Sequence, residues 1–492
     1  MPKRSRRTQP ARETQQPQIR LGAGSYWLGI AAIVIAAGAV RLACAGGDLW
    51  LDEIRTLKLL EEATRPTEIL TKLLHDNNHP LNSWWLFLLG AGRSAVTYRL
   101  LAVIAGTISV LIAGEVGRRQ AQLVNPKTTA AMANVAGLFT AACIGFSYLL
   151  IHYSSEARGY APAMCFSLLA IYALSRDLAR PWGAPLYWIA CVLGLLSHVT
   201  IVQVMFGGLA WSVFFALGQW RGWRERIAHV AYWHLVPWTA FGLYYALFMS
   251  RVAVGGGPID GLWGVLCDLA AFLIGVPVSA GGIAFVILAV VVLAGCVSLG
   301  RQNRGIASFF WLAVIIGPLA SISSEHFILL FPRYFLISGM CALLLVGRML
   351  AQLWTSNRRV ISGVLLALFL AGNVVHTTRL IQDGRGQYRE ALQYVAAQSP
   401  GPTITVAADN DFRNGMVIEY YAATVSGKTI EFHPAAAPPP AGAEWLFFHR
   451  LDNSPVPADR VSDRGGHRYL LDRVFPHAAL SGWDWYVFRR VN

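Results

Sequence analysis

Long apolar runs recur along this chain between about residue 25 and residue 378. A helix of about 20 apolar residues is long enough to span the hydrocarbon core of a bilayer. A water-soluble protein carries about a quarter of its residues as charged side chains, whereas only 14% of these 492 residues are charged. The runs therefore predict a mainly α-helical, polytopic membrane protein.

Eleven runs are predicted to cross the membrane, and the basic residues between them set the orientation. Short loops with arginine pairs, such as Arg118 and Arg119 or Arg358 and Arg359, are expected in the cytoplasm. The predicted spans are 25–43, 99–117, 129–150, 161–175, 185–198, 201–218, 230–249, 283–299, 306–322, 334–350 and 360–378. An odd number of spans places the C-terminal part on the outer side.

The segments between these spans are then divided between the two faces. Those expected to face outward are 46–98, 152–160, the junction near 198, 251–262 and 323–333. One more apolar run, 263–281, is predicted to be a re-entrant or interfacial helix. A crossing there would move the basic loop at 301–305 to the outer face.

Composition divides the chain into three parts. Residues 1–20 are polar and basic, and they predict a disordered cytoplasmic tail. Residues 21–380 hold the apolar runs and form the predicted transmembrane domain. From 381 to 492, strand-like segments at 403–409, 428–432, 444–450 and 484–490 alternate with amphipathic ones, which predicts a small soluble α/β domain on the periplasmic side.

The formal charge of +14 does not indicate a nucleic-acid partner. Most arginines and lysines lie in the short loops between apolar runs, and no basic patch with interleaved aromatic residues is present in the sequence. The seven cysteines are scattered singly without the spacing of metal ligands, and they read as small buried apolar residues.

The first outward loop holds the densest cluster of acidic residues in the chain. Ionisable groups beside hydrocarbon are costly, and proteins usually keep them for function. We therefore expect a functional site here. The cluster, over residues 46–82, comprises Asp48, Asp52, Glu53, Glu61, Glu62, Glu68 and Asp76, with His75 and His79.

Four more polar signals lie on the predicted outer side, and each allows two interpretations. His79 lies at the N-terminal end of a helix that the following proline can begin. The segment either contributes His79 to the site or, with its Trp pair at 84–85, is only an interfacial anchor. Glu156 and Arg158, in EARGYA, either contact substrate or brace the first loop. Arg333, in FPRYF, either binds a phosphate or reaches the lipid headgroups. His198 is either a ligand-contacting residue or a hydrogen-bonded core histidine.

Taken in order, LDE, NNHP, EARGYA, SH and FPRYF resemble the GT-C superfamily of membrane glycosyltransferases. The resemblance is to the branch of protein O-mannosyltransferases and lipid A aminoarabinose transferases, and it covers roughly residues 25–350. It implies a polyprenyl-phosphate-sugar donor and a catalytic acidic residue in the first outward loop.

The resemblance also implies roles for individual residues. The catalytic acid corresponds to Asp52, with Glu53 beside it, whereas Asp48 is close by without matching the motif. His79 corresponds to the HP element, although HPLN replaces the commoner second proline and aromatic residue. The EAR element is Glu156 with Arg158, and the late RY element is Arg333 with Tyr334.

The chemistry of an inverting transfer agrees with this assignment. One base must take the acceptor proton, and Asp52 is the candidate. The leaving phosphate needs cations, and Arg333, Arg158 and Lys72 are candidates in that order. Asp48, Glu156, Tyr334, His79 and His198 are expected to bind substrate or brace the loop. A divalent metal bridging donor phosphate and carboxylate is left open.

The acceptor is expected to be a lipid, a glycan or a protein of the cell envelope, reached from the outer face of a bacterial inner membrane. Two other classes of function remain open. One is a flippase or transporter of a lipid-linked sugar, which would need charges along a pore. The other is a non-catalytic scaffold, which leaves the acidic cluster unexplained. Replacing Asp52 by Asn separates them, because only the enzyme would lose its function.

Overall fold

The computed structural model describes residues 22–180, 182–253, 255, 261–323, 330–437, 439 and 441–491. The basic tail predicted over 1–20 lies outside the described residues. So do parts of the outward segments predicted at 251–262 and 323–333.

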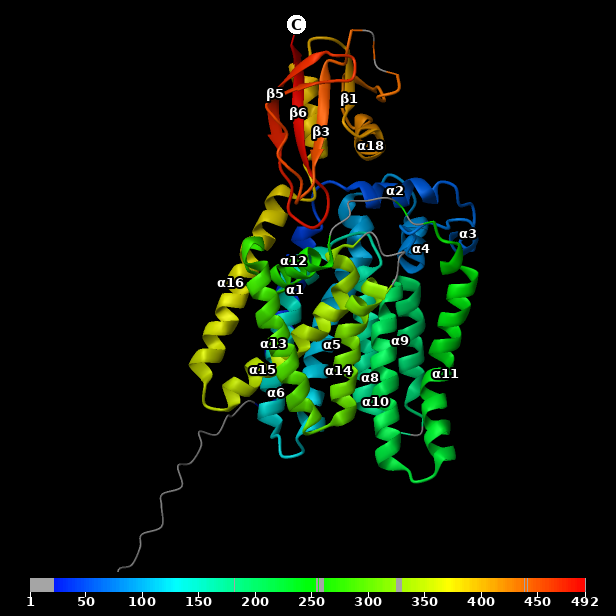
Figure 1. Ribbon diagram of the computed structural model, residues 1–492, viewed down its shortest axis with the longest axis vertical. Helices are drawn as coiled ribbons and strands as arrows, with labels where there is room; N and C mark the ends of the chain where they lie inside the picture. The colour runs from blue at the N-terminus through cyan, green and yellow to red at the C-terminus, as the bar shows by residue number, and fades with distance from the viewer. Residues whose placement is uncertain are drawn as a thin grey trace, which may run out of the picture.

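A bundle of long helices forms the larger part of the molecule, and each of the eleven predicted spans corresponds to one of them (Figure 1). These helices are α1 (Ala23–Cys44), α5 (Ala95–Val124), α6 (Ala130–Phe146), α8 (Tyr160–Asp177), α9 (Ala184–Ser197), α10 (Val202–Gln219), α11 (Trp223–Leu247), α13 (Gly281–Gly300), α14 (Arg304–Ser323), α15 (Leu336–Thr355) and α16 (Arg359–Asp383). By length and composition alone, six helices in the described part of the chain can cross a membrane. The protein is therefore a polytopic helical membrane protein, as the sequence predicts.

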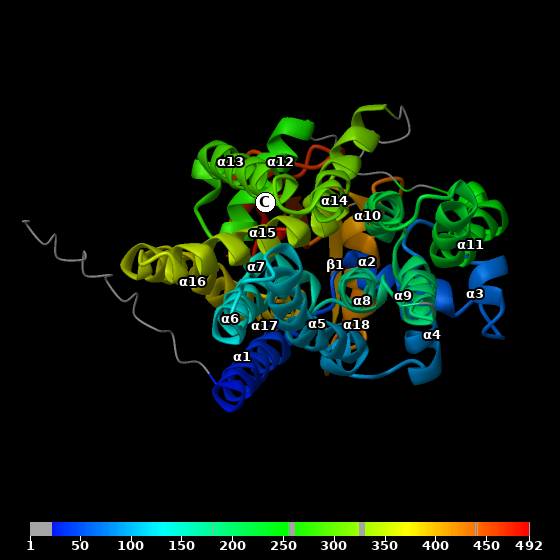
Figure 2. The same cartoon turned by 90° about the horizontal axis from the view of Figure 1, so that it is seen from below.

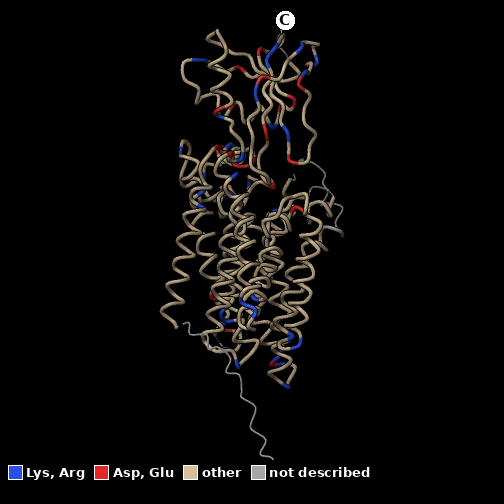
Figure 3. Tube along the Cα trace, turned by 90° about the vertical axis from the view of Figure 1, so that its left-hand side faces the viewer, with Lys and Arg blue, Asp and Glu red and all other residues tan. Residues whose placement is uncertain are grey.

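Viewed along the bundle, α16 lies at one edge and α11 at the opposite edge, with α8 and α10 between them (Figure 2). Figure 3 shows lysine, arginine, aspartate and glutamate gathered at the two ends of the bundle and in the C-terminal part of the chain. This distribution places the polar groups where lipid headgroups and water can solvate them.

Helix α12 (Leu262–Ile274) is the segment predicted to be re-entrant or interfacial. Its 13 residues extend about 20 Å, which is less than the hydrocarbon thickness of a bilayer. The helix ends at Gly275, whose φ of 80° is left-handed, and a Cβ there would meet the backbone nitrogen of Asn373 in α16. Figure 1 shows α12 at the end of the bundle nearest the C-terminal domain.

The C-terminal domain is built on a six-stranded sheet in the order β2-β1-β3-β6-β5-β4. Its strands are β1 (Thr403–Ala408), β2 (Thr429–Phe432), β3 (Trp445–Arg450), β4 (Arg460–Ser462), β5 (Arg468–Phe475) and β6 (Asp484–Val491). β1 pairs in parallel with β2 and β3, whereas β3, β6, β5 and β4 pair antiparallel. Helices α17 (Tyr388–Gln398) and α18 (Met416–Ala422) precede and follow β1 in the chain.

The first outward loop lies between the bundle and this sheet domain. It contains three short helices, α2 (Leu51–Leu60), α3 (Glu68–Thr71) and α4 (Pro80–Leu89), which Figure 1 shows at the junction. Leu49 and Ile54 belong to the same buried apolar cluster as Tyr388 and Trp445 of the C-terminal domain. The Leu49 backbone nitrogen also donates a hydrogen bond to the hydroxyl of Tyr421, at 2.6 Å. The C-terminal domain therefore holds the first loop in place.

Candidate active site

Helix α2 begins at the acidic pair of the LDE motif. Glu53 accepts a hydrogen bond from the backbone nitrogen of Trp50 at 3.2 Å, as in a capping box. Acidic residues in a first turn also interact favourably with the helix dipole. Because successive helical residues are rotated by about 100°, Asp52 and Glu53 point to different sides.

Glu53 points into the protein. Its carboxylate is fully buried and accepts hydrogen bonds from Nε of Arg99, at 2.8 Å, and from the backbone nitrogen of Ala157, at 2.7 Å. Arg99 also donates to the backbone oxygens of Gly46 and Asp48. We expected Glu53 beside Asp52 at the reaction centre, but the structure places it in a buried ion pair that fixes the loop.

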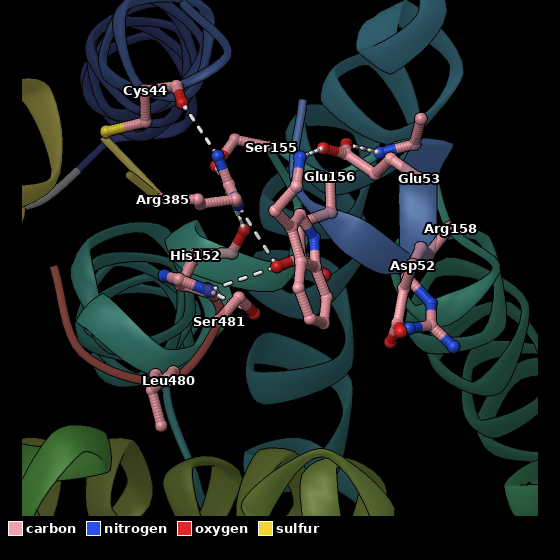
Figure 4. A network of polar contacts seen from close by, with 12 residues as sticks. Cys44, Asp52, Glu53, His152, Ser155, Glu156, Arg158, Arg385, Leu480 and Ser481 are labelled. Atoms are coloured by element: carbon pink, nitrogen blue, oxygen red, sulfur yellow. Dashed lines mark hydrogen bonds and ion pairs between the residues drawn. The ribbon is translucent and has the colours of Figure 1, made fainter. Parts of the chain in front are cut away.

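Asp52 points into a cavity, where two arginines meet it. Nη1 of Arg158 donates a hydrogen bond to Oδ2 of Asp52, and Figure 4 shows the two side chains facing each other. Nη2 of Arg333 lies 3.8 Å from the same oxygen. Arg333 belongs to the short 3-10 helix η4 (Pro332–Phe335) before α15, and Arg158 to the loop before α8. Residues about 100 and 280 positions from Asp52 in sequence thus converge on it.

His79 and Asn77 hold the guanidinium of Arg158 from the other side. Nη2 of Arg158 lies 3.2 Å from both Oδ1 of Asn77 and Nε2 of His79. Because an arginine only donates, Nε2 of His79 accepts, and the ring is neutral. Burial, and then the charge of Arg333, lower the pKa of His79 to about 4.

The loop around Gly159 brings His79 and His198 together. The two rings lie 5.1 Å apart, centroid to centroid, and both contact Tyr160. A Cβ on Gly159 would lie 2.0 Å from the carbonyl oxygen of Ser197 and 2.8 Å from Cβ of His79. The glycine of EARGYA therefore permits the close approach of three segments that the sequence predicts to face outward.

The cavity has a volume of about 770 Å³, and three groups of residues line it. Asp52, Arg158, Arg333 and His79 line its polar part. Side chains of the membrane helices form the apolar part, among them Val202, Phe248, Ile316 and Ala320. A third group lines the part nearest the C-terminal domain and comprises Arg55, His75, Asp76, Asn410, Phe412 and Arg413.

The remaining predicted site residues divide into two groups. Tyr334 and His198 line the cavity. Lys72 is not among the described lining residues, since its largely exposed side chain pairs with Glu68 at 2.8 Å. Asp48 lies on the other side of the loop, where its carboxylate accepts a hydrogen bond from the backbone nitrogen of Arg389 at 2.7 Å.

Glu156 is fully buried outside the cavity, in a polar network with the start of the C-terminal domain (Figure 4). Its Oε1 lies 3.1 Å from Nε of Arg385 and 3.1 Å from Nε2 of His152. Burial favours the uncharged acid, but His152 and Arg385 outweigh it and hold the pKa of Glu156 at about 2. Of the two interpretations weighed for the EAR element, this geometry favours bracing for Glu156 and direct contact for Arg158.

Sequence reasoning did not single out Arg55 or the three residues from the C-terminal domain. Arg55 follows Asp52 by three positions, so a helical reading of the LDE segment places both on one face. Asn410, Phe412 and Arg413 carry no comparable signal, because only the docking of the C-terminal domain brings them to the cavity.

Within the described ranges, no group of three or more His, Cys, Asp or Glu side chains lies close enough to hold a metal ion. A divalent ion shared between Asp52 and a donor phosphate would not need such a group. Chelation of divalent ions tests metal dependence.

Comparison with solved structures identifies the fold. ArnT from Cupriavidus metallidurans in the apo state matches with a TM-score of 0.50 and 12% sequence identity, over 84% of this chain and 86% of ArnT. ArnT bound to undecaprenyl phosphate matches with a TM-score of 0.44 at 12% identity, over 95% of this chain and 98% of that chain. The Archaeoglobus fulgidus oligosaccharyltransferase tethered with an acceptor peptide gives 0.44 at 12% identity, over 84% of this chain and 64% of that one. No protein-family model and no curated protein matches the sequence.

At this level of identity the likeness to apo ArnT concerns the fold. The chain thus shares the fold of that structure.

Proposed function

We propose that this protein is an inverting membrane glycosyltransferase. It transfers a sugar from a polyprenyl-phosphate donor to an acceptor of the cell envelope, with Asp52 as the base. The observation that carries the proposal is the convergence of Arg158 and Arg333 on Asp52 inside the cavity. Two cations around one carboxylate leave a net charge of +1 in a largely buried place, and such a charge favours the binding of an anion.

The polar and apolar parts of the cavity lining suit the two parts of such a donor. A polyprenyl phosphate has an apolar chain and a phosphate headgroup. Val202, Phe248 and Ile316, on helices α10 and α14 and just after α11, offer an apolar surface on the bundle side. Arg158 and Arg333 offer planar guanidinium groups, which bind phosphate oxygens through paired hydrogen bonds.

In the proposed reaction, the acceptor hydroxyl oxygen forms a bond to the anomeric carbon as the bond from that carbon to the phosphate oxygen breaks. Asp52 takes the hydroxyl proton, and the electron pair of the broken bond leaves with the phosphate. The products are the glycosylated acceptor, with inverted configuration, and polyprenyl phosphate. The charge that grows on the leaving phosphate is stabilised by Arg158 and Arg333.

The arginines also account for the readiness of Asp52 to act. Without donor, both cations are directed at its carboxylate. A donor phosphate competes for the same N–H groups, so donor binding weakens the contacts of the two arginines with Asp52. The base becomes free to accept a proton only when the leaving group is in place.

The proposed location is a bacterial inner membrane, with the site on its periplasmic face. The basic loops between the spans support that orientation. The alternative of a lipid-linked-sugar flippase would need a polar path through the bundle. The gathering of charged residues at the two ends in Figure 3 supports the transferase instead.

The test uses the full chain purified into lipid vesicles, together with labelled polyprenyl-monophosphate sugars and a crude envelope extract. Release of polyprenyl phosphate is followed for the wild type and for Asp52→Asn. The proposal expects release by the wild type alone, with both proteins folded. Equal release of polyprenyl phosphate by Asp52→Asn would show that Asp52 is not the base. Donor binding without consumption of any donor would favour the flippase.

A further inference from the structure

A turn of the C-terminal domain reaches the cavity. It is the short π-helix η5 (Asp411–Gly415), which follows β1. Asn410, Phe412 and Arg413 from this turn line the cavity together with Arg55 of α2. The proposed chemistry at Asp52 uses none of these four residues, so their presence in the cavity needs its own explanation.

Phe412 presents an aromatic surface there. The guanidinium of Arg55 lies 4.8 Å from the centre of its ring, which covers one face. Phe412 is nevertheless 49% exposed. An aromatic face carries partial negative charge and attracts the partially positive C–H groups of a ligand, such as those along one side of a sugar ring. A half-exposed phenylalanine beside polar groups is therefore suited to stacking with a carbohydrate.

Two arginines beside this ring are each held by a histidine and an aspartate. Nη1 of Arg413 donates to Nε2 of His449 at 2.9 Å, and Nδ1 of His449 lies 2.9 Å from Oδ2 of Asp409. The same order of groups recurs at Arg55. There, Arg55 contacts Nε2 of the histidine in the pair His75 and Asp76.

These histidines fix the direction of each guanidinium group. In each case Nε2 of the histidine contacts the arginine and Nδ1 contacts the aspartate. An arginine has five N–H donors, and the histidine takes one. The planar fork thus stays oriented and can donate to two oxygens of a ligand at once. Paired donors in a fixed plane suit neighbouring hydroxyls on a sugar.

The position relative to Asp52 suits an acceptor. Arg55 lies three residues after Asp52 in α2, and side chains at that spacing share a helix face with about 5–6 Å between their Cβ atoms. A ligand held by Arg55 and Phe412 would therefore place a hydroxyl next to the proposed base. The apolar part of the cavity, which suits the prenyl chain, is formed by other elements.

We propose that Arg55, Asn410, Phe412 and Arg413 form the acceptor subsite, and that it binds a sugar residue of a glycan or glycolipid. This inference rests on the proposed function and names the acceptor class for it. The role of the C-terminal domain is then to recognise the acceptor.

A peptide acceptor fits the described lining less well. Peptides are often bound by adding a strand to the edge of a sheet. Among the described residues that line the cavity, none belongs to strands β1–β6, and all come from helices, turns and loops. The planar polar side chains around Phe412 instead offer donors and acceptors that a hydroxyl-rich ring can satisfy.

The first test measures binding rather than turnover. The full chain in detergent is applied to an array of defined oligosaccharides, to the same sugars carried on lipid in vesicles, and to a panel of serine- and threonine-containing peptides. The variants are Phe412→Ala, Arg413→Gln and the conservative Phe412→Tyr. Val456→Ala and Arg464→Gln are matched controls, because both residues are exposed and neither lines the cavity.

We expect a subset of the sugars to bind to the wild type. Phe412→Ala, which removes the ring, and Arg413→Gln, which removes the guanidinium, should each weaken that binding about tenfold or more. A site that hydrogen-bonds a polar ligand loses much affinity when one of its partners is removed. Phe412→Tyr should retain the binding, because it keeps the ring. Both controls should bind as the wild type does. The soluble and vesicle arms show whether the sugar must be carried on lipid.

The same variants are then assayed for transfer, with donor release in the absence of acceptor as a separate readout. The inference expects a higher acceptor KM for Phe412→Ala and Arg413→Gln with donor binding unchanged. It is overturned if wild-type binding or transfer is confined to peptides, if no sugar binds, or if both variants bind sugars as the wild type does. If sugar binding depends on Phe412 but the protein consumes no donor, the subsite proposal stands and the proposed transferase function is contradicted.

Discussion

Arg385 donates a hydrogen bond from Nε to Oε1 of Glu156 across 3.1 Å, and both side chains are fully buried. Arg385 follows α16 at the start of the C-terminal domain, whereas Glu156 lies in the loop that also carries Arg158. The same guanidinium donates to the backbone oxygen of His152 and to Oγ of Ser155 (Figure 4). One buried ion pair therefore couples the docking of the C-terminal domain to the loop that carries Arg158, which is proposed to bind the donor phosphate.

Replacing Arg385 by Gln should destabilise the protein strongly. The change leaves the Glu156 carboxylate buried without its cation, and breaking a buried pair costs about 3–5 kcal/mol. We expect a clear fall in the midpoint of thermal unfolding in detergent. The double variant Glu156→Gln with Arg385→Gln should recover part of the loss, because it removes the unpaired charge.

A matched control comes from the same domain. Arg473 and Glu390 form an ion pair of similar length, 3.2 Å, but both side chains are about half exposed. Exposed pairs contribute about 0–1 kcal/mol, so Arg473→Gln should leave the unfolding midpoint almost unchanged. Equal effects of Arg385→Gln and Arg473→Gln would contradict the role assigned to the buried pair.

Glu53→Gln and Asp52→Asn should differ in kind although the residues are neighbours. Glu53 is fully buried against Arg99, so the neutral side chain should lower the unfolding midpoint by the mechanism just described. Asp52 lies in the cavity, where a neutral side chain should abolish transfer and leave the midpoint close to that of the wild type. Thermal unfolding and donor release, measured on both variants, check this. If Glu53→Gln is as stable as the wild type but inactive, Glu53 takes part in the reaction and does not only fix the loop.

The extent to which sequence predicts this structure follows from the range of the interactions. The helices that correspond to the eleven predicted spans are readable because hydrophobic runs act locally. The convergence of Asp52, Arg158 and Arg333 was reached only through the resemblance of ordered motifs to a family, since no local pattern brings residues of three separate segments together. The division of labour between Asp52 and Glu53 depends on which helix face is buried, and a single acidic pair does not encode that.

The C-terminal domain marks the limit of such reasoning. The segments at 403–409, 428–432, 444–450 and 484–490 correspond to β1, β2, β3 and β6, whereas β4 and β5 were not singled out. Phe412 and Arg413 look like ordinary residues of an amphipathic segment in the sequence. They line the cavity because the apolar cluster that contains Leu49 and Tyr388 docks the domain on the first loop.

Arg333→Gln should weaken donor binding, whereas Lys72→Gln should not. Arg333 lines the cavity near Asp52, whereas the largely exposed Lys72 pairs with Glu68. Hydrogen bonds to charged groups contribute about 1.5–3 kcal/mol, which corresponds to roughly 10- to 150-fold in affinity. Binding of a labelled polyprenyl-monophosphate sugar to each variant in vesicles measures the difference. A loss of affinity in Lys72→Gln as large as that in Arg333→Gln would show that the phosphate lies nearer the loop surface.

His79 should make the stability of the protein sensitive to mild acid. Burial, then the charge of Arg333, lower the pKa of His79 from its ordinary 6.5 to about 4 in the folded protein. Between these two values the unfolded state binds more protons than the folded state, so the free energy of unfolding falls as pH falls through this window. The stabilisation is complete above the ordinary pKa, and it is lost by the time pH reaches about 4.

The variant His79→Gln isolates this effect, because the glutamine side chain can still accept a hydrogen bond from Arg158 and does not titrate. The unfolding midpoints of both proteins are measured from about pH 7.5 to about pH 4.5, and their difference cancels the contribution of the other titrating groups. We expect the midpoint of the wild type to fall relative to that of His79→Gln as pH decreases, with most of the change below the ordinary histidine pKa. A difference that stays constant with pH would mean that His79 takes up its proton equally in both states, and that its ring is not the neutral acceptor that holds Arg158 toward Asp52.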